Sequence, residues 1–543
     1  MKSGKYHNLP NRSKTPFFNS RQTLAFAISA ALAASSAASV SVASPAEFEL
    51  SSLDGGNGFV LNGEAERDAF GRTSSGAGDV NGDGLNDLII GAPLSDDGGD
   101  RAGRSYVVFG SSAGFSATFD LASLDGTNGF VINSESADDL QGWSVTGAGD
   151  INGDGVDDLI VGAIEGGVDG AETGRSYVVF GSEEGFTSPF ELSSMNGANG
   201  FTILGEMDGD EFGGSVAAAG DINGDDLDDL IIGASRSDAN GDRAGRSYVI
   251  FGSQTPFSAT FDVSLLDGTN GFALDGEAPS DYSGISVSGA GDINGDGLDD
   301  LIIGATFADP NGNSSGRSYV VFGSSGGFTS PFSLNSLDGS NGFFVNGENT
   351  NDQSGISVSA AGDVNADAID DLIVGTRFAS RAYLVYGSNK PFSSVIEASA
   401  LNGSNGFVLI SPSEGDGFGR AVAAAGDLNA DGIDDLLVGA ERGSGDGGLT
   451  GRAYVIFGAS GGFPSLFDVS TLDGANGNVL LGVATNDQAG ASVAALGDFN
   501  GDGLADLTIG APGADTNGDR SGSAYVVFSQ LPDGIFADRF QSD

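Results

Sequence analysis

The sequence predicts an all-β fold, a seven-bladed β-propeller of four-stranded blades, and three observations lead to this prediction. One short string recurs seven times, each period contains four stretches typical of strands, and the two ends of the array are complementary parts of one period. Nearly the whole chain after residue 43 belongs to this array, so we expect one architecture rather than several domains.

The repeated string is Gly-Asp-x-Asn-x-Asp-x-φ-x-Asp-Leu, in which φ is Leu, Ile or Val. Successive copies lie 71 residues apart, except that the fifth and sixth copies lie 64 apart. In the second period we expect strands at 142–148, 159–163, 176–180 and 200–204. Small residues crowd the first of these because the innermost strands of a propeller converge on a narrow axis. No stretch has the 3.6-residue period of a helix.

The ends of the array predict how the ring closes. The first strand from the N-terminus, 58–61, is of the fourth kind in a period, and the last strand, 525–528, is of the third kind. We therefore expect the N-terminal strand to join the last blade as its outer strand, which leaves no open edge between blades.

The N-terminus has the layout of a secretory signal peptide. Residues 1–21 carry five basic and no acidic side chains, an apolar run follows at 24–34, and small residues continue to Ala43. Eleven apolar residues are fewer than the ~20 needed to span a bilayer. We expect cleavage near Ala43, a propeller over 44–529, and a C-terminal tail at 530–543 that is either disordered or a sorting element. The protein is then secreted or held at the cell surface, with no transmembrane segment.

The composition excludes several classes of function. The chain has 75 acidic and 22 basic residues, for a formal net charge of -53, and such a surface repels nucleic acid and anionic membranes. It has no cysteine, and its one histidine, His7, lies in the signal peptide. Thiolate chemistry, disulfides and a histidine base are therefore excluded from the mature chain.

The acidic string itself predicts calcium binding. Positions 1, 3, 5 and 9 carry carboxylates or amides and position 7 offers a carbonyl, as in an EF-hand loop, and hard oxygen donors select calcium. The alternative is that the strings are only hairpin turns, but turning requires fewer acidic residues. We expect up to seven Ca²⁺ ions, one per blade, with weaker sites in copies three and five, where Asp226 and Ala368 replace the glycine at position 6. The predicted ligands are Asp79, Asn81, Asp83, Leu85, Asp87, Asp150, Asn152, Asp154, Val156, Asp158, Asp221, Asn223, Asp225, Leu227, Asp229, Asp292, Asn294, Asp296, Leu298, Asp300, Asp363, Asn365, Asp367, Ile369, Asp371, Asp427, Asn429, Asp431, Ile433, Asp435, Asp498, Asn500, Asp502, Leu504 and Asp506.

The repeat resembles the FG-GAP repeat of integrin α-subunit propellers. The first copy carries Phe70-Gly71 and Gly91-Ala92-Pro93, and the seventh retains Gly510-Ala511-Pro512 but has Ala489 in place of Phe. Copies two, four and five also lack that Phe. The resemblance covers about residues 47–529. It implies seven blades, calcium loops on a lower face and ligand recognition on the opposite, upper face, but it does not identify a ligand.

An arginine opens the third strand in six periods, at Arg104, Arg175, Arg246, Arg317, Arg381 and Arg452, with Ser523 in the seventh. These residues could form an anion-binding ring, but structural ion pairs with nearby carboxylates are the favoured interpretation. Tyr106 and its equivalents are expected in the core. The period of 64 residues arises because the loop between Gly375 and Arg381 is seven residues shorter than in the other copies. We expect this short loop to leave a notch near Arg377, which could be a binding site.

The leading hypothesis is a monomeric, secreted binding or adhesion module for an extracellular protein or polysaccharide. The rival is a carbohydrate-active enzyme, a hydrolase or lyase that uses paired carboxylates. No acidic pair stands out from the repeats, because the glutamates at Glu64, Glu206, Glu277 and Glu348 also recur with the period. A lectin is a weaker third option, because the chain has one tryptophan, Trp143, on which a sugar could stack.

Overall fold

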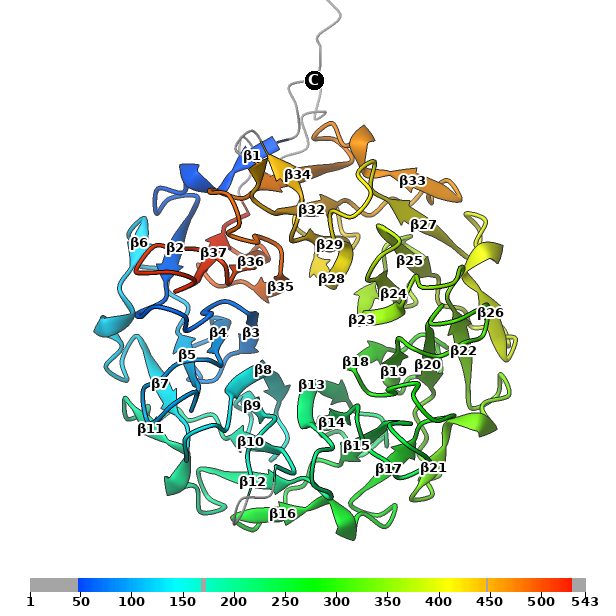
Figure 1. The fold of residues 1–543 in the computed structure, drawn as a ribbon, viewed down its shortest axis with the longest axis horizontal. Helices are drawn as coiled ribbons and strands as arrows, with labels where there is room; N and C mark the ends of the chain where they lie inside the picture. The colour runs from blue at the N-terminus through cyan, green and yellow to red at the C-terminus, as the bar shows by residue number, and fades with distance from the viewer. Residues whose placement is uncertain (1–46, 168–171, 446–447, 530–543) are drawn as a thin grey trace, which may run out of the picture. The chain divides into compact units, whose positions relative to one another are not determined.

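Seven small sheets stand around a common axis, as Figure 1 shows in a view along that axis. The computed structural model describes residues 47–167, 172–445 and 448–529, all within the compact unit that begins at Pro45. The predicted signal peptide and C-terminal tail lie outside the described residues. The predicted seven-bladed propeller is confirmed.

Each blade contains four antiparallel strands, which we call A to D from the axis outward. The A strands are β3 (Thr73–Gly78), β8 (Gln141–Gly149), β13 (Phe212–Gly220), β18 (Ser286–Gly291), β23 (Ser354–Gly362), β28 (Phe418–Gly426) and β35 (Ser492–Gly497). The B strands are β4 (Asp87–Ala92), β9 (Asp158–Ala163), β14 (Asp229–Ala234), β19 (Asp300–Ala305), β24 (Asp371–Thr376), β29 (Asp435–Ala440) and β36 (Asp506–Ala511). In the second period these bounds lie within one residue of those predicted.

The two outer members of the four follow the same scheme. The C strands are β5 (Arg104–Val108), β10 (Arg175–Val179), β15 (Arg246–Ile250), β20 (Arg317–Val321), β25 (Arg381–Val385), β32 (Arg452–Ile456) and β37 (Ser523–Val527). The D strands of blades one to seven are β7 (Gly129–Asn133), β12 (Gly200–Leu204), β17 (Gly271–Asp275), β22 (Gly342–Asn346), β27 (Gly406–Ile410), β34 (Gly477–Leu481) and β2 (Gly58–Asn62).

A fifth strand, which the sequence did not reveal, lies outside strand D and runs parallel to it in every blade. These E strands are β11 (Phe190–Glu191), β16 (Thr260–Asp262), β21 (Phe332–Ser333), β26 (Val395–Glu397), β33 (Leu466–Asp468), β1 (Glu47–Glu49) and β6 (Thr118–Phe119) for blades one to seven. Six of them come from the C–D connection of the following repeat and β1 comes from the N-terminal segment before β2, so every blade takes its outermost strand from its neighbour.

Short 3-10 helices and one hairpin complete the described elements. One 3-10 turn follows each E strand: η1 (Leu50–Ser52), η2 (Leu121–Ser123), η3 (Leu192–Ser194), η4 (Val263–Leu265), η5 (Leu334–Ser336), η6 (Ala398–Ala400) and η7 (Val469–Thr471). The hairpin pairs β30 (Ser444–Gly445) with β31 (Gly448–Leu449). Nowhere in the described residues is there a helix that could span a bilayer.

The predicted closure of the ring is confirmed and involves two blades instead of one. Strand β2 pairs antiparallel with β37, so that Val60 lies opposite Tyr525. Strand β1 pairs parallel with β34, which places Phe48 opposite Leu480 of blade six. The N-terminal segment thus supplies strand D of blade seven and strand E of blade six.

The hydrophobic core lies between the blades. Every residue of the B strands is buried, so these strands contact both neighbouring blades. Between blades three and four, for example, Ile231 and Phe272 pack in one cluster with Ile303 and Tyr319. Face-to-face phenylalanines mark six of the seven junctions, with ring centroids 4.1–4.5 Å apart: Phe59–Phe115, Phe130–Phe186, Phe201–Phe257, Phe272–Phe328, Phe343–Phe392 and Phe407–Phe463. The phenylalanine-rich C–D connections therefore pack each blade against the next.

We predict that deleting residues 47–62 lowers the melting temperature in thermal unfolding, because it removes β1 and β2. Phe59 and Leu61 on β2 are fully buried, and losing large buried side chains costs about 2–5 kcal/mol each. The control is Glu47→Gln at an exposed position of β1, which should leave the melting temperature unchanged. An unchanged melting temperature in the deletion variant would show that the termini do not hold the ring closed.

Candidate metal centres

The seven acidic strings form the loops that join strand A to strand B. All seven lie at one end of the ring, the lower face, whereas the B–C loops and D–A turns lie at the other end, the upper face, because neighbouring strands are antiparallel. In blade one the loop starts after Gly78, the last residue of β3, and position 9 is Asp87, the first residue of β4. Gly78 has φ +76°, and a Cβ there would lie 2.3 Å from Asp157 of the next blade, so only glycine fits.

The carboxylates at positions 1 and 5 organise the loop backbone. In blade one, Asp79 accepts hydrogen bonds from the N–H groups of Asp83 (3.0 Å) and Gly84 (2.8 Å). Asp83 in turn accepts one from the N–H of Leu85, at position 7 (3.0 Å). The same three bonds recur in the other six loops. The seven loops therefore share one conformation.

The position-9 aspartates are fully buried. Asp87 accepts hydrogen bonds from the N–H of Val80 (3.0 Å) and of Gly110 beyond strand C (2.8 Å), and the same pattern recurs in every blade. Burial raises the pKa to about 8 for each of them: Asp87, Asp158, Asp229, Asp300, Asp371, Asp435 and Asp506. None of them forms an ion pair with a basic side chain among the described residues.

The position-3 asparagines take two orientations. In blades two, three, four, five and seven the side-chain amide donates to the position-9 carboxylate: Asn152, Asn223, Asn294, Asn365 and Asn500. In blades one and six the side-chain oxygen of Asn81 and Asn429 accepts from the position-5 N–H. The amide group at this position therefore differs between otherwise equivalent loops.

The predicted donors share a loop in each blade, but their side chains do not converge. Among the described residues, no three acidic or histidine side chains form a group ready to hold a metal. The carboxylates of Asp79 and Asp83 are nevertheless close enough to that of Asp87 for their negative charges to add to the rise of its pKa that burial causes. The donors are all oxygen atoms, three of them from carboxylate side chains, and this chemistry fits a hard divalent cation such as calcium.

Position 6 requires a left-handed backbone, as expected. Asp226 has φ +65° and Ala368 has φ +66°, where the other loops have glycine. Position 4 is a second such position, which the repeated string did not reveal: Ala366 and Ala430 have φ of +62° and +58° there. The left-handed conformation costs a non-glycine residue roughly 1–2 kcal/mol, so the loop of blade five, with two alanines, is the most strained.

We predict that Ala368→Gly stabilises the protein by about 0.5–1 kcal/mol, because relief of backbone strain exceeds the added entropy of the unfolded chain. The matched change is Gly84→Ala in blade one, which should destabilise by a similar amount. A Cβ at Gly84 meets nothing within 4 Å, so only backbone conformation is tested. Denaturant unfolding measures both, and an Ala368→Gly variant no more stable than the parent would contradict the prediction.

Position 8 of the loop links neighbouring blades. The repeated string has no fixed residue at this position, so the link was not predicted. The carboxylate of Asp157 accepts a hydrogen bond from the N–H of Asp79 in the preceding blade (2.8 Å). Equivalent bonds from the position-1 N–H groups of the preceding blades are accepted by Asp228, Asp299, Asp370, Asp434 and Asn86. The signal was present in the sequence, since aspartate occupies position 8 in five of seven copies.

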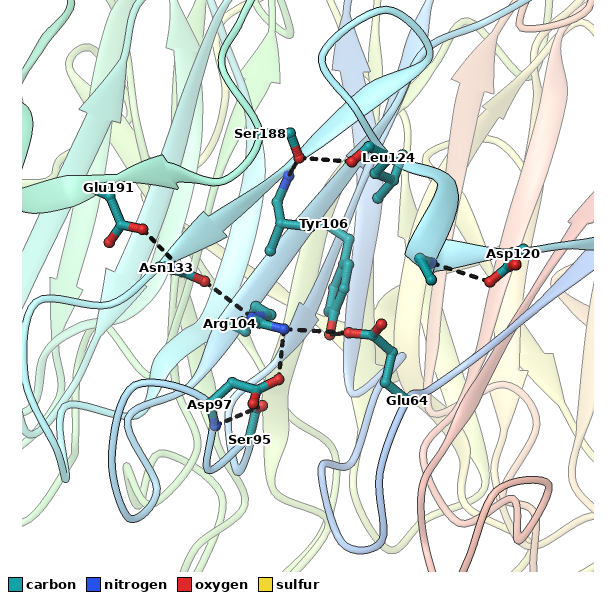
Figure 2. Close-up of polar contacts among 12 residues, drawn as sticks. Glu64, Ser95, Asp97, Arg104, Tyr106, Asp120, Leu124, Asn133, Ser188 and Glu191 are labelled. Atoms are coloured by element: carbon teal, nitrogen blue, oxygen red, sulfur yellow. Dashed lines mark hydrogen bonds and ion pairs between the residues drawn. The ribbon is translucent and has the colours of Figure 1, made fainter.

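Five of the six arginines of strand C form ion pairs, which confirms the favoured interpretation for them, whereas Arg452 donates to the carbonyl oxygen of Ser444. Arg104 contacts Glu64 of the preceding D–A turn (3.3 Å) and Asp97 (2.6 Å), and the hydroxyl of Tyr106 donates to the same glutamate (2.8 Å; Figure 2). The corresponding pairs are Arg175–Glu135, Arg246–Glu206, Arg317–Glu277 and Arg381–Glu348. Tyr106 is fully buried, as predicted. The periodic glutamates therefore bind the D–A turns to the blades.

The upper face is interrupted at blade five. Its B–C loop has only four residues, 377–380, where blade one has eleven, 93–103. Phe378 in this short loop is 56% exposed. The predicted shortening is thus present, and it leaves an aromatic side chain on the surface.

Comparison with known proteins supports the assignment made from the repeats. A family model described as the FG-GAP repeat matches six stretches: 70–108, 142–179, 212–250, 283–321, 418–456 and 489–527. These stretches cover strands A to C of blades one to four, six and seven.

Relatives with known names include two integrin α subunits. Integrin alpha pat-2 of Caenorhabditis elegans is 29% identical over 47% of this chain and 19% of its own length, and integrin alpha-IIb of Mus musculus is 32% identical over 33% and 16%. A phosphatidylinositol-glycan-specific phospholipase D of Dictyostelium discoideum is 28% identical over 54% of this chain and 31% of its own length. The chain thus spans less than a third of each relative. The unit of strand A, acidic loop, strand B and strand C recurs around one ring, six of its seven copies match the FG-GAP repeat, and the chain is similar in sequence to integrin α subunits.

Proposed function

We propose that this protein is a secreted, calcium-stabilised propeller that acts as a binding or adhesion module for an extracellular macromolecule. The observation that carries this proposal is the difference between the two faces. The lower loops are seven copies of one conformation, whereas the upper loops differ between blades and expose large apolar side chains. Among the described residues, five of the eight exposed large hydrophobic residues lie on upper-face loops and turns: Leu94, Met207, Phe378, Leu449 and Val483. Apolar groups gathered on one face are typical of a macromolecular interface.

Calcium is the cofactor that the lower loops fit best. In each blade, positions 1, 3, 5 and 9 would supply side-chain oxygens and position 7 a carbonyl. A bound divalent cation would offset the mutual repulsion of the loop carboxylates. At a dissociation constant of ~0.1 mM in ~1 mM calcium, each site would contribute about 1.4 kcal/mol. Seven such sites would contribute about 10 kcal/mol, comparable to the stability of an ordinary domain.

We therefore predict that a strong chelator such as EDTA lowers the melting temperature, that excess calcium restores it, and that magnesium does not. Asp83→Asn removes one ligand charge and should weaken the calcium dependence. The control is Glu184→Gln, an exposed change outside the loops, which should behave like the parent. A melting temperature that does not respond to EDTA would overturn the calcium proposal.

Catalysis is the competing assignment, because one of the relatives is named a phospholipase D. That similarity covers less than a third of the relative. The carboxylates outside the loops that recur in this chain, such as Glu64 and Glu206, accept hydrogen bonds from arginine and tyrosine. They are therefore engaged in holding the D–A turns.

We predict that the immobilised full chain retains at least one partner from a panel of extracellular proteins and polysaccharides in 1 mM calcium, and that it hydrolyses none of them. Surface plasmon resonance measures retention, and product analysis on the same panel measures turnover. Because the partner is expected on the upper face, Met207→Ser and Phe378→Ser should reduce retention, while Leu265→Ser, exposed on η4, should not. Turnover of any panel member would favour the enzymatic assignment.

A further inference from the structure

A cavity of 880 Å³ occupies the upper part of the propeller axis. Its walls are the inner strands, and its mouth is formed by D–A turns and B–C loops of the upper face. The volume lies within the range of about 300–1,000 Å³ that is common for ligand sites. The cavity is thus large enough to admit side chains from another molecule.

The mouth of this cavity is basic, in contrast to the rest of the protein. Five arginines line it, Arg67, Arg72, Arg420, Arg442 and Arg520, with only two acidic residues, Glu441 and Asp519. The whole chain has a net charge of -53, and only 17 basic residues follow residue 43. The cavity mouth therefore concentrates the positive charge that the strand C ion pairs do not use.

The cluster, which we call the axial arginines (Arg67, Arg72, Arg420, Arg442 and Arg520), is only partly neutralised. Arg420 pairs with Glu441, which also lies 3.5 Å from Arg442. Among the described residues, Arg72 and Arg520 have no ion-pair partner. Burial and the positive charges of Arg420 and Arg520 lower the pKa of Arg72, so these side chains repel one another. An anion would relieve that repulsion.

Arg72 is held by an aromatic ring. Its guanidinium carbon lies 3.9 Å from the ring centroid of Trp143, the only tryptophan of the chain. In the part of the chain that the structure describes, the N–H groups of Arg72 have no carboxylate partner. A stacked guanidinium is pre-organised for bidentate hydrogen bonding to a carboxylate.

Two upper-face loops carry exposed apolar side chains. Leu94 lines the cavity and is exposed, and Phe378 projects from the short loop of blade five. Burial and the positive charges of Arg420 and Arg442 lower the pKa of Arg377, which precedes Phe378 in the chain. The notch in blade five therefore leads to the axial arginines. Arginine, aromatic and aliphatic side chains in one patch favour a protein partner over a polysaccharide.

We propose that the axial arginines bind the carboxylates of an acidic segment in a partner protein, whose flanking apolar residues contact Leu94 and Phe378. This inference rests on the proposed binding function and identifies the class of partner. The acidic segment would insert at the cavity mouth, where Arg72 and Arg520 pair with its carboxylates and Trp143 lies at the base of the contact.

The single tryptophan makes the site directly observable. The probe is a short peptide in which glutamates alternate with leucine and phenylalanine. The control peptide has the same sequence with glutamine in place of every glutamate. In 1 mM calcium we expect the acidic peptide to change Trp143 fluorescence saturably, with at least about tenfold higher affinity than the glutamine peptide, because charge-assisted hydrogen bonds are lost in the latter. Equal affinity of the two peptides would overturn the proposal.

Variants of the axial arginines show where the peptide binds. Their peptide affinity is measured by calorimetry, because Arg72 contacts Trp143 and its loss would change the fluorescence. Arg72→Gln and Arg520→Gln should each weaken acidic-peptide binding about tenfold. The matched control is Arg243→Gln, at the same repeat position as Arg520 in blade three, which does not line the cavity and contacts Tyr282 instead. Its affinity should equal that of the parent, and an equal loss in Arg243→Gln would show that only the general charge matters.

Competing ligands and the proposed function are tested separately. An oligogalacturonate that binds more tightly than the acidic peptide would assign the site to an acidic saccharide and overturn the proposal. Self-association that Arg72→Gln abolishes would identify a second copy of this chain as the occupant, which also overturns it. If a macromolecule retained by the parent binds the Arg72→Gln, Arg520→Gln double variant equally well, the axial site is wrong while the binding function stands.

Discussion

The buried carboxylate at the start of each B strand is the contact on which this propeller depends. Asp87 and its six equivalents are fully buried, and each accepts hydrogen bonds from the acidic loop and from the second residue after strand C. One side chain thereby fixes the lower ends of strands A, B and C. A buried carboxyl group is costly unless it is hydrogen-bonded, and here two backbone N–H groups supply the bonds. The position must therefore be aspartate for structural reasons, apart from any metal.

Two further layers of contacts build on this one. Position 8 carries the bond to the neighbouring blade, so the acidic loops hold the ring together at its lower face. At the upper face, neighbouring blades are linked by ion pairs between strand C arginines and D–A glutamates, such as Arg246 with Glu206. Between these faces lie the apolar clusters and stacked phenylalanines. The acidic residues are thus concentrated in structural roles, which explains how so charged a chain can fold.

Much of the fold could be predicted from the sequence, because period, strand pattern and complementary ends are all local signals. The fifth strand could not: β11 has two residues, and its pairing with β7 depends on where the preceding blade lies. The loop positions were predicted, but the role of Asp157 was not, because its partner, the N–H of Asp79, is 78 residues away. The axial arginines escaped prediction for the same reason. Arg72 and Arg420 occupy the same repeat position in blades one and six, but Arg520 belongs to a B–C loop of blade seven, and only the closed ring brings the three together.

The exchange of outer strands has a consequence for the order of folding. Strand β2 is synthesised directly after β1, at the start of the described residues, but its partner β37 is the last described strand to be made. The hydroxyl of Ser523 donates a hydrogen bond to Asn62, 461 residues away in the chain. The middle blades can assemble as they emerge, but blade seven stays incomplete until β37 has been made. Contacts of such high sequence separation form slowly. The edge of β2, with Phe59 and Leu61, is therefore the apolar surface that remains unprotected longest, and a chaperone or an export pathway that keeps the chain unfolded would have this segment to shield.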